Sequence, residues 1–349
     1  MGMPYFGRPI PFDMPFVGQH GDEGVFTQEI TSCAERLGAS HKEKQAAQAL
    51  SGKIKTKLDQ LVSNPELLET LKIEDVYEIG SVKTDTALAG HCVADITIIT
   101  SVLPFQEMME SLSTYLISSF GDECISCYPT EYGCLVTTTE AQARLLVTIT
   151  PNNASELEPG LHLDADLMRV AYQAVRQTQY IEGLSHQPIP LKELIRVVKD
   201  VRRRFSGLHH LNIWVLQYLC YFSLMKEPER IPLPLGPAFR RFFQLLSAGI
   251  FLPNAAPMYD PAEPSRPLGS DLTFEQMDEL CATAQTILRL ICNKGQSIVL
   301  GVSRLGSDVT KQDTHLSNVV IRPSRPIYCE EDMKPKFCEE DLKLLSVRE

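Results

Sequence analysis

The sequence predicts an α+β fold, in which a mixed-sheet domain with helices precedes an all-helical domain. Up to about residue 150, segments with helical periodicity alternate with short runs rich in β-branched residues, such as "ADITIIT" and "RLLVTIT". Beyond Pro151 only helical periodicity recurs, over residues 162–182, 190–205, 211–225, 235–251 and 272–293, with Pro- and Gly-rich segments between them. We therefore expect domains at 26–155 and 156–322, a flexible tail at 1–25 and a charged tail at 323–349.

The elements of the first half can be placed in order. Apolar residues recur at three- and four-residue steps from Ser40 to Val62, which predicts a helix with Ser40 as its N-cap. A strand near 76–79, a turn at Gly80-Ser81 and a strand near 94–100 follow. The spacing predicts a second helix over 105–120, ending at Gly121, and then two or three strands up to residue 150.

Composition narrows the function classes. The net charge of −11 disfavours a chain that binds nucleic acid mainly through its own surface, because neutralising phosphates requires a basic surplus. The sequence contains no run of 18 apolar residues, so it predicts no membrane span. Ten cysteines scattered through 349 residues are typical of reduced thiols in the cytosol or nucleus.

The segment "YEIGSVKTDTALAGHCVADITIIT" carries the chemistry that the sequence suggests. A Gly-Ser turn followed by a strand with an acid near its start is the layout that nucleotidyl transfer uses, with two metal ions clamping the reacting oxygens. Such ions need carboxylates at i and i+2 of the strand, which share one face, and a third from a neighbouring strand. Here Asp95 stands alone, because position 93 is Val93 and residues 144–150 contain no acid. We therefore predict no catalytic residue and no metal site.

The stretch "GSVKTDTALAGHCVADITII" resembles the corresponding turn and strand of oligoadenylate synthetases and poly(A) polymerases. "LKELIRVVKDVRRRF" followed by "LNIWVLQYLCYFSL" resembles the paired helices of their second domain. Within that superfamily, residues 25–322 are most similar to the DZF family, the domain associated with zinc fingers. The resemblance implies a template-free nucleotidyltransferase or oligoadenylate-synthetase-like fold.

The resemblance also implies a role. The most similar member type is the smaller subunit of a nuclear heterodimer, which lacks the first and third acids. We expect a catalytically inactive subunit that pairs with a larger DZF protein carrying double-stranded-RNA-binding or zinc-finger modules. RNA, and DNA if any, would be bound mainly through that partner, in nuclear RNA metabolism and transcription regulation; no membrane is involved, and shuttling to the cytoplasm is left open.

A vestigial nucleotide site is a separate hypothesis. It comprises Gly80, Ser81, Asp95 and Lys199, since the resemblance places Lys199 where related enzymes contact a triphosphate. Lys192, Arg196, Lys199 and Arg203 recur at helical spacing, so a solvated basic face is the alternative. We expect no cofactor, and leave weak binding of a nucleoside triphosphate with Mg²⁺ open.

Two further patterns suggest sites. "CISC" at 124–127 with Cys134 hints at zinc, but no second ligand pair follows at suitable spacing. The helices at 235–251 and 272–293 are broadly apolar, so they are either core or partner surface. The candidate interface residues are Phe242, Phe243, Leu246, Phe251, Phe274, Met277, Leu280 and Leu288.

Two other functions stay open at this point. One is an active, template-independent nucleotidyltransferase that uses unorthodox acids such as Asp85 or Glu140. The other is a stand-alone RNA-binding module. Nucleotide incorporation would favour the first, and tight RNA binding by the isolated chain would favour the second.

Overall fold

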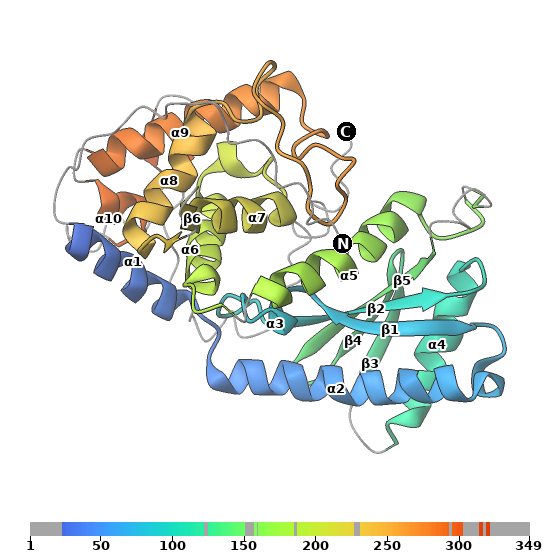
Figure 1. The fold of residues 1–349 in the computed structure, drawn as a ribbon. Coiled ribbons are helices and arrows are strands. Elements are labelled where there is room, and N and C mark those ends of the chain that lie inside the picture. The colour runs from blue at the N-terminus through green and yellow to red at the C-terminus, as the bar shows by residue number, and fades with distance from the viewer. Residues whose placement is uncertain are drawn as a thin grey trace. The chain divides into compact units, whose positions relative to one another are not determined.

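The computed structural model describes residues 23–121, 125–150, 157–158, 160–184, 187–226, 231–292, 295–302, 314–316 and 319–321. The chain forms two compact units (Figure 1). The sheet unit comprises residues 38–186, and the helical unit combines residues 1–37 with 187–327. Most of the predicted tails at 1–25 and 323–349 lie outside the described residues. Within the described part of the chain, no helix is both long and apolar enough to cross a membrane.

The sheet unit is built on five strands in the order β1-β2-β5-β4-β3. β2 and β5 are parallel, and the other neighbours are antiparallel, so the sheet is mixed as predicted. The parallel pair is made by a crossover that includes a helix, as parallel strands require. The strands are β1 (Ile73–Ile79), β2 (Val93–Thr100), β3 (Ser126–Thr130), β4 (Gly133–Thr137) and β5 (Gln142–Ile149).

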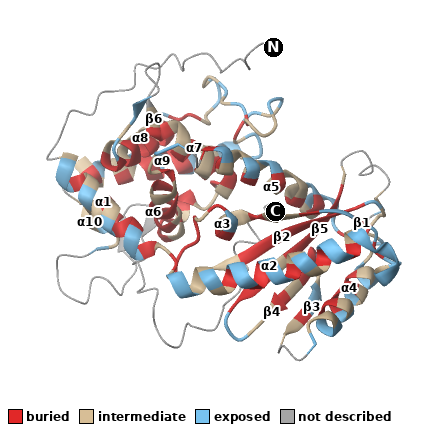
Figure 2. Cartoon of the chain, turned by 60° about the horizontal axis from the view of Figure 1, so that its bottom comes forward, coloured by how far each residue is buried: buried red, intermediate tan, exposed pale blue. Residues whose placement is uncertain are grey.

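Helices cover both faces of this sheet. α2 (His41–Ser63) and α4 (Gln106–Ser119) bury their apolar residues against one face, in a cluster with the even-numbered side chains Ile96 and Ile98 of β2. α5 (Ala165–Leu184) packs on the other face, where Ala171 and Val175 meet apolar side chains of the strands. Since side chains alternate along a strand, odd-numbered positions of β2 face α5. The buried stripe of α2 is visible in Figure 2.

The predicted start of α2 is confirmed in detail. The Ser40 hydroxyl accepts the N–H of Glu43, and the Glu43 carboxylate accepts the N–H of Ser40, which is a capping box. The other Glu43 oxygen accepts the N–H of Gly90 at 2.8 Å, so the cap also fixes the loop before β2. The predicted end of α4 is also confirmed, because Gly121 follows it with φ 61°.

The helical unit contains the remaining long helices. Trp214 on α7 donates its indole N–H to the buried Asp260, which anchors the loop before α9. α8 is surrounded by α1, α7 and α9, which explains its nearly all-round apolar sequence. The helices are α1 (Glu23–Leu37), α6 (Leu191–Arg204), α7 (Ile213–Leu224), α8 (Leu235–Ser247), α9 (Phe274–Cys292) and the single turn α10 (Gln296–Val299).

Shorter elements complete the two units. The sheet unit has a 3₁₀ turn, η1 (Pro65–Leu68), and the one-turn helix α3 (Gly80–Lys83). The helical unit has a 3₁₀ turn, η3 (Ser206–Leu208), and two small antiparallel ladders. Their strands are β6 (Met225–Lys226) with β7 (Ile231–Pro232), and β8 (Thr314–Leu316) with β9 (Val319–Ile321).

Two helices lie in a different unit from the one expected from their place in the sequence. α5 falls in the range 156–322 but packs on the sheet, because Ala171 and Val175 are buried there. α1 starts inside the predicted tail and belongs to the helical unit: Phe26 packs edge-on against Phe239 of α8, with ring centroids 6.1 Å apart. The helical unit is therefore assembled from both ends of the domain sequence.

Candidate functional site

The Gly80-Ser81 turn has a backbone that only glycine fits well. Gly80 has φ +77°, and a Cβ built there would lie 2.4 Å from Oδ2 of Asp95. Its N–H donates to the hydroxyl of Thr178 on α5 at 3.1 Å. Gly80 therefore lies directly against Asp95, so the structure brings together these two residues of the predicted nucleotide site.

The side chain opposite Asp95 is a cation. In the parallel pairing of β2 with β5, Arg144 is the register partner of Asp95, and its Nε donates to Oδ1 of Asp95 at 2.6 Å. Asp95 is 7% exposed, so this ion pair is largely removed from solvent. Two positions earlier Val93 is paired with Gln142, so this end of the β2–β5 pair carries one carboxylate and one guanidinium. Sequence reasoning missed Arg144, although a charge in the otherwise apolar "ARLLVTI" was a signal.

Asp85 and Glu140, the acids that an active enzyme would use in place of the missing ones, form ion pairs with lysines elsewhere on the sheet unit. Asp85 accepts a 2.7 Å ion pair from Lys44, and Glu140 lies 3.6 Å from Lys42 on the surface. Among the described residues, no three His, Cys, Asp or Glu side chains are grouped so that they would hold a metal ion. Neither acid therefore supplements Asp95 in this structure.

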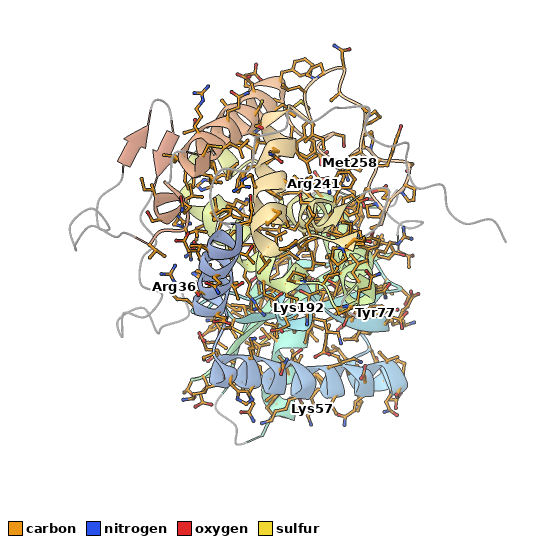
Figure 3. The ribbon with its side chains drawn as sticks, turned by 60° about the vertical axis from the view of Figure 1, so that its left-hand side comes forward. Arg36, Lys57, Tyr77, Lys192, Arg241 and Met258 are labelled. Carbon is orange, nitrogen blue, oxygen red and sulfur yellow. The ribbon has the colours of Figure 1, made fainter. Side chains whose placement is uncertain are left out.

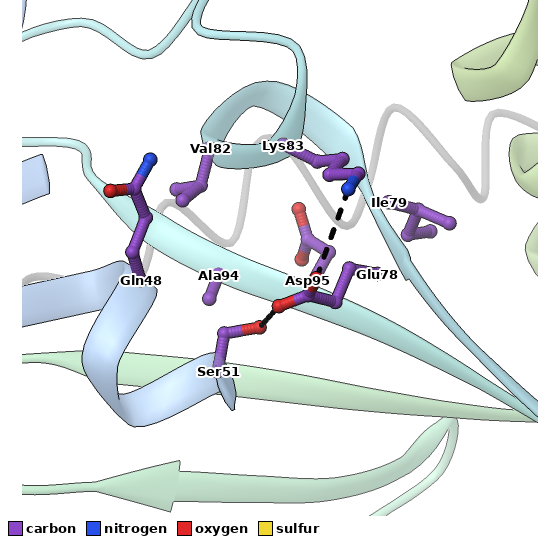
Figure 4. A pocket seen from close by; sticks show the side chains of 8 residues that line it. All are labelled: Gln48, Ser51, Glu78, Ile79, Val82, Lys83, Ala94 and Asp95. Carbon is purple, nitrogen blue, oxygen red and sulfur yellow. Dashed lines mark hydrogen bonds and ion pairs between the residues drawn. The ribbon is translucent and has the colours of Figure 1, made fainter. Parts of the chain in front are cut away.

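A cavity of about 350 Å³ opens beside the turn, between α2, β1, α3 and β2 (Figure 4). The carboxylates of Glu78 and Asp95 face this space, and the Ser51 hydroxyl donates to Glu78 at 2.6 Å. Sequence reasoning did not find this cavity, because its polar residues come from segments that show only helix or strand periodicity. The lining residues are Gln48, Ser51, Glu78, Ile79, Val82, Lys83, Ala94 and Asp95.

Lys199 lies on α6 in the helical unit, and the alternative of a fully solvated basic face on α6 does not match the burial of its residues. Arg196 of that face is only 9% exposed, and Lys199 is half-buried. Burial raises the pKa of the Cys220 thiol well above its usual value. The nearby positive charge of Lys199 opposes this rise.

Buried polar contacts explain why α6 tolerates so many charges in the interior. Asp200 is completely buried and accepts from Nε of Arg204 at 2.8 Å. A second nitrogen of Arg204 donates to the carbonyl of Val299, and Arg36 of α1 (Figure 3) donates to the carbonyl of Leu300 at 3.3 Å. The charges therefore fasten α10 and the residue after it to α1 and α6.

The candidate interface residues divide into two groups. Phe242, Phe243, Leu246 and Leu280 are at most 2% exposed and belong to the core of the helical unit, so they do not form a surface. Figure 2 shows α8 in the colours for buried and intermediate residues. Phe274 is 69% exposed at the start of α9. Phe251, Met277 and Leu288 are half-buried and accessible in part.

The cysteines of the suggested zinc motif serve as apolar residues where they are described. Cys127 and Cys134 are buried in the sheet core between the sheet and α4. Cys124 lies outside the described residues. The His209-His210 pair sits after η3, where His210 forms a 2.8 Å contact with Glu279.

Comparisons with solved structures identify the fold. The crystal structure of the poly(U) polymerase Cid1 matches with a TM-score of 0.55 at 13% identity, covering 78% of this chain and 95% of that chain. Cid1 in complex with the UTP analogue UMPNPP gives a TM-score of 0.53 at 13% identity, covering 77% and 94%. CdnC of E. coli MS115-1 in its complex with HORMA-deltaN gives 0.54 at 12% identity, covering 78% and 91%. At these identities the likeness shows a nucleotidyltransferase-like fold, a mixed-sheet part followed by a helical part.

Family models account for most of the sequence. The model of the DZF N-terminal domain matches residues 6–186, and the model of the DZF C-terminal domain matches residues 190–322. Together they span the turn, the Asp95–Arg144 pair, the cavity and the long helices of the helical unit. The chain therefore belongs to the DZF family.

Proposed function

We propose that this chain is a catalytically inactive subunit with a nucleotidyltransferase fold. It would form a heterodimer with a larger double-stranded-RNA-binding DZF protein and act in nuclear RNA metabolism and transcription regulation. The proposal that the chain is catalytically inactive rests on the ion pair between Asp95 and Arg144, with an Nε–Oδ1 distance of 2.6 Å.

The ion pair supports inactivity through electrostatics. The fold family implies two divalent cations, which need several carboxylates because each must be stripped of part of its hydration and held against the other. Here the residues do not fit such a pair. Asp95 is the one acid on this face of β2, Val93 is apolar, and Arg144 places a fixed positive charge against the Asp95 oxygen. A divalent cation at Asp95 would be repelled by the guanidinium at close range.

The net charge of the chain supports the proposal that a partner binds most of the RNA. A chain with net charge −11 lacks the basic surplus on which phosphate binding depends. Membership of the DZF family favours a second DZF protein as the partner, with RNA bound mainly through its modules. The accessible apolar residues Phe274, Met277 and Leu288 on α9 are candidates for the partner surface.

Two measurements test the proposal. Purified chain, incubated with RNA, Mn²⁺ and labelled nucleotides, should incorporate no more label than the Asp95→Asn variant, because neither contains a metal site. Incorporation that disappears in Asp95→Asn would instead establish an active nucleotidyltransferase. Co-expression with a larger DZF protein should yield one co-eluting complex, and RNA should bind tightly to the complex and weakly to this chain alone. Tight binding by the isolated chain at physiological salt would contradict the proposed division of labour.

A further inference from the structure

The cavity beside the Gly80 turn combines an apolar wall with an acceptor-rich end. Ile79, Val82 and Ala94 form the apolar wall, and the carboxylates of Glu78 and Asp95 face the same space (Figure 4). Its volume of about 350 Å³ falls within the range of small-molecule sites, which is roughly 300–1,000 Å³.

The charges around the cavity favour a cation over an anion. Three carboxylates, of Glu78, Asp95 and Glu182, stand against two cationic groups, of Lys83 and Arg144. Arg144 is committed to Asp95 at 2.6 Å and does not line the cavity. A triphosphate would therefore meet a site whose summed charge has the same sign as its own, whereas an organic cation would meet the opposite sign.

The Glu78 carboxylate keeps one oxygen outside hydrogen-bond length of the described donors around it. Glu78 accepts the Ser51 hydroxyl through Oε1, and its Oε2 lies 3.9 Å from the Lys83 ammonium, beyond hydrogen-bond length. Lys83 lies closer to Glu182, at 3.4 Å, and can stay there when Glu78 takes another donor. Asp95 bonds Arg144 through Oδ1, and its Oδ2 is packed against Gly80, so this carboxylate contributes charge to the cavity and not a free acceptor.

We propose that this cavity binds a guanidinium or primary ammonium group carried on an alkyl stem. The cationic group donates to Glu78 Oε2, and the stem packs on Ile79, Val82 and Ala94. Charge-assisted hydrogen bonds of this kind are about twice as strong as neutral ones, and the apolar wall favours a stem over a hydrated inorganic ion. The site is independent of the proposed loss of catalysis, because it uses neither metal nor nucleotide.

The test is calorimetric titration of the full chain with agmatine, a free dication with a guanidinium at one end and a primary ammonium at the other, and with N-acetylarginine methylamide, which represents an arginine side chain of another protein. Glu78→Gln should weaken agmatine binding about tenfold, because a neutral amide replaces the charged acceptor at nearly the same shape. Lys83→Met should strengthen it about threefold by removing a nearby competing cation. Glu140→Gln, which removes an exposed acid of the same unit outside the cavity, is the matched control and should leave affinity unchanged.

The outcomes distinguish a free small molecule from a side chain of another protein, and a cationic ligand from an anionic one. Binding of agmatine alone assigns the site to a free metabolite-sized cation, and equal binding of both probes assigns it to the guanidinium group itself, including one on a partner protein. If neither probe binds at millimolar concentration, the proposal is wrong. It is equally overturned if UTP binds and Lys83→Met weakens that binding, because the cavity would then be an anion site. Lys83→Met keeps the test decisive if Glu78→Gln fails to fold.

Discussion

Replacing Arg144 by Met should destabilise the sheet unit by about 2–4 kcal/mol, because it leaves the Asp95 carboxylate without its counter-charge in a poorly solvated position. Breaking a fully buried pair by removing one partner costs about 3–5 kcal/mol, and an exposed pair is worth under about 1 kcal/mol. The Arg144 and Asp95 side chains are 18% and 9% exposed, so the buried figure applies with a modest discount.

A double-mutant cycle isolates the pair. Asp95→Asn, Arg144→Met and the double variant should show a coupling free energy of about 2 kcal/mol, since the double variant no longer buries a lone charge. Hydrogen exchange of the β2 and β5 amides reports the stability of the sheet unit. The single tryptophan, Trp214, lies in the helical unit, and its fluorescence should be unchanged.

The sheet unit supplies its own control. Lys42 and Glu140 form an ion pair whose side chains are 84% and 63% exposed, so their cycle should give a coupling of under about 1 kcal/mol. If the free energies of the Asp95 and Arg144 variants simply add, the two residues do not act as a buried pair. The electrostatic argument for a neutralised Asp95 would then fail.

Three other changes test different parts of the structure. Val93→Asp restores an acid on the face of Asp95 and should raise Mn²⁺ affinity in calorimetry without giving nucleotide incorporation, because Arg144 remains; turnover in that variant would show that another residue supplies the missing carboxylate. Gly80→Ala should lower stability by about 2 kcal/mol or more, since the new Cβ meets Asp95 at positive φ; an unchanged denaturation midpoint would contradict that backbone conformation. Phe274→Asp should weaken the proposed heterodimer without lowering the melting temperature, whereas the buried Phe242→Ala should cost about 3–5 kcal/mol of stability; the reverse pattern would remove α9 from the proposed partner surface.

Local sequence patterns were enough to predict many of the helices and strands. The capping box of Ser40 and Glu43 and the glycine after α4 are encoded within a few residues, so the helix boundaries there were predictable. The alternation in "ADITIIT" and "RLLVTIT" located β2 and β5. The sequence did not reveal that α5 packs on the sheet, because an amphipathic helix shows that it has a partner and not which one.

Only the part of the site that is encoded within one short segment of the sequence could be predicted. Gly80 and Asp95 are linked by a motif along the chain, whereas the pairing of Asp95 with Arg144 depends on the register of two strands that are parallel and distant in sequence. The burial of charged residues on α6 could not be predicted for a similar reason. Arg204 is buried because a carboxylate on its own helix and a carbonyl from the far end of the unit neutralise and bind it.

The position of α1 has a consequence for synthesis on the ribosome. Thr27 of α1 accepts the N–H of Gly236, a residue 209 positions later in the chain. At roughly 5–20 residues per second, the apolar side of α1 waits about 10–40 s after it emerges before α8 exists to cover it. During that interval the sheet unit can fold completely, so Phe26 stays exposed beside a finished domain. A nascent chain of this kind should bind holding chaperones through its first helix until α8 has emerged from the ribosome.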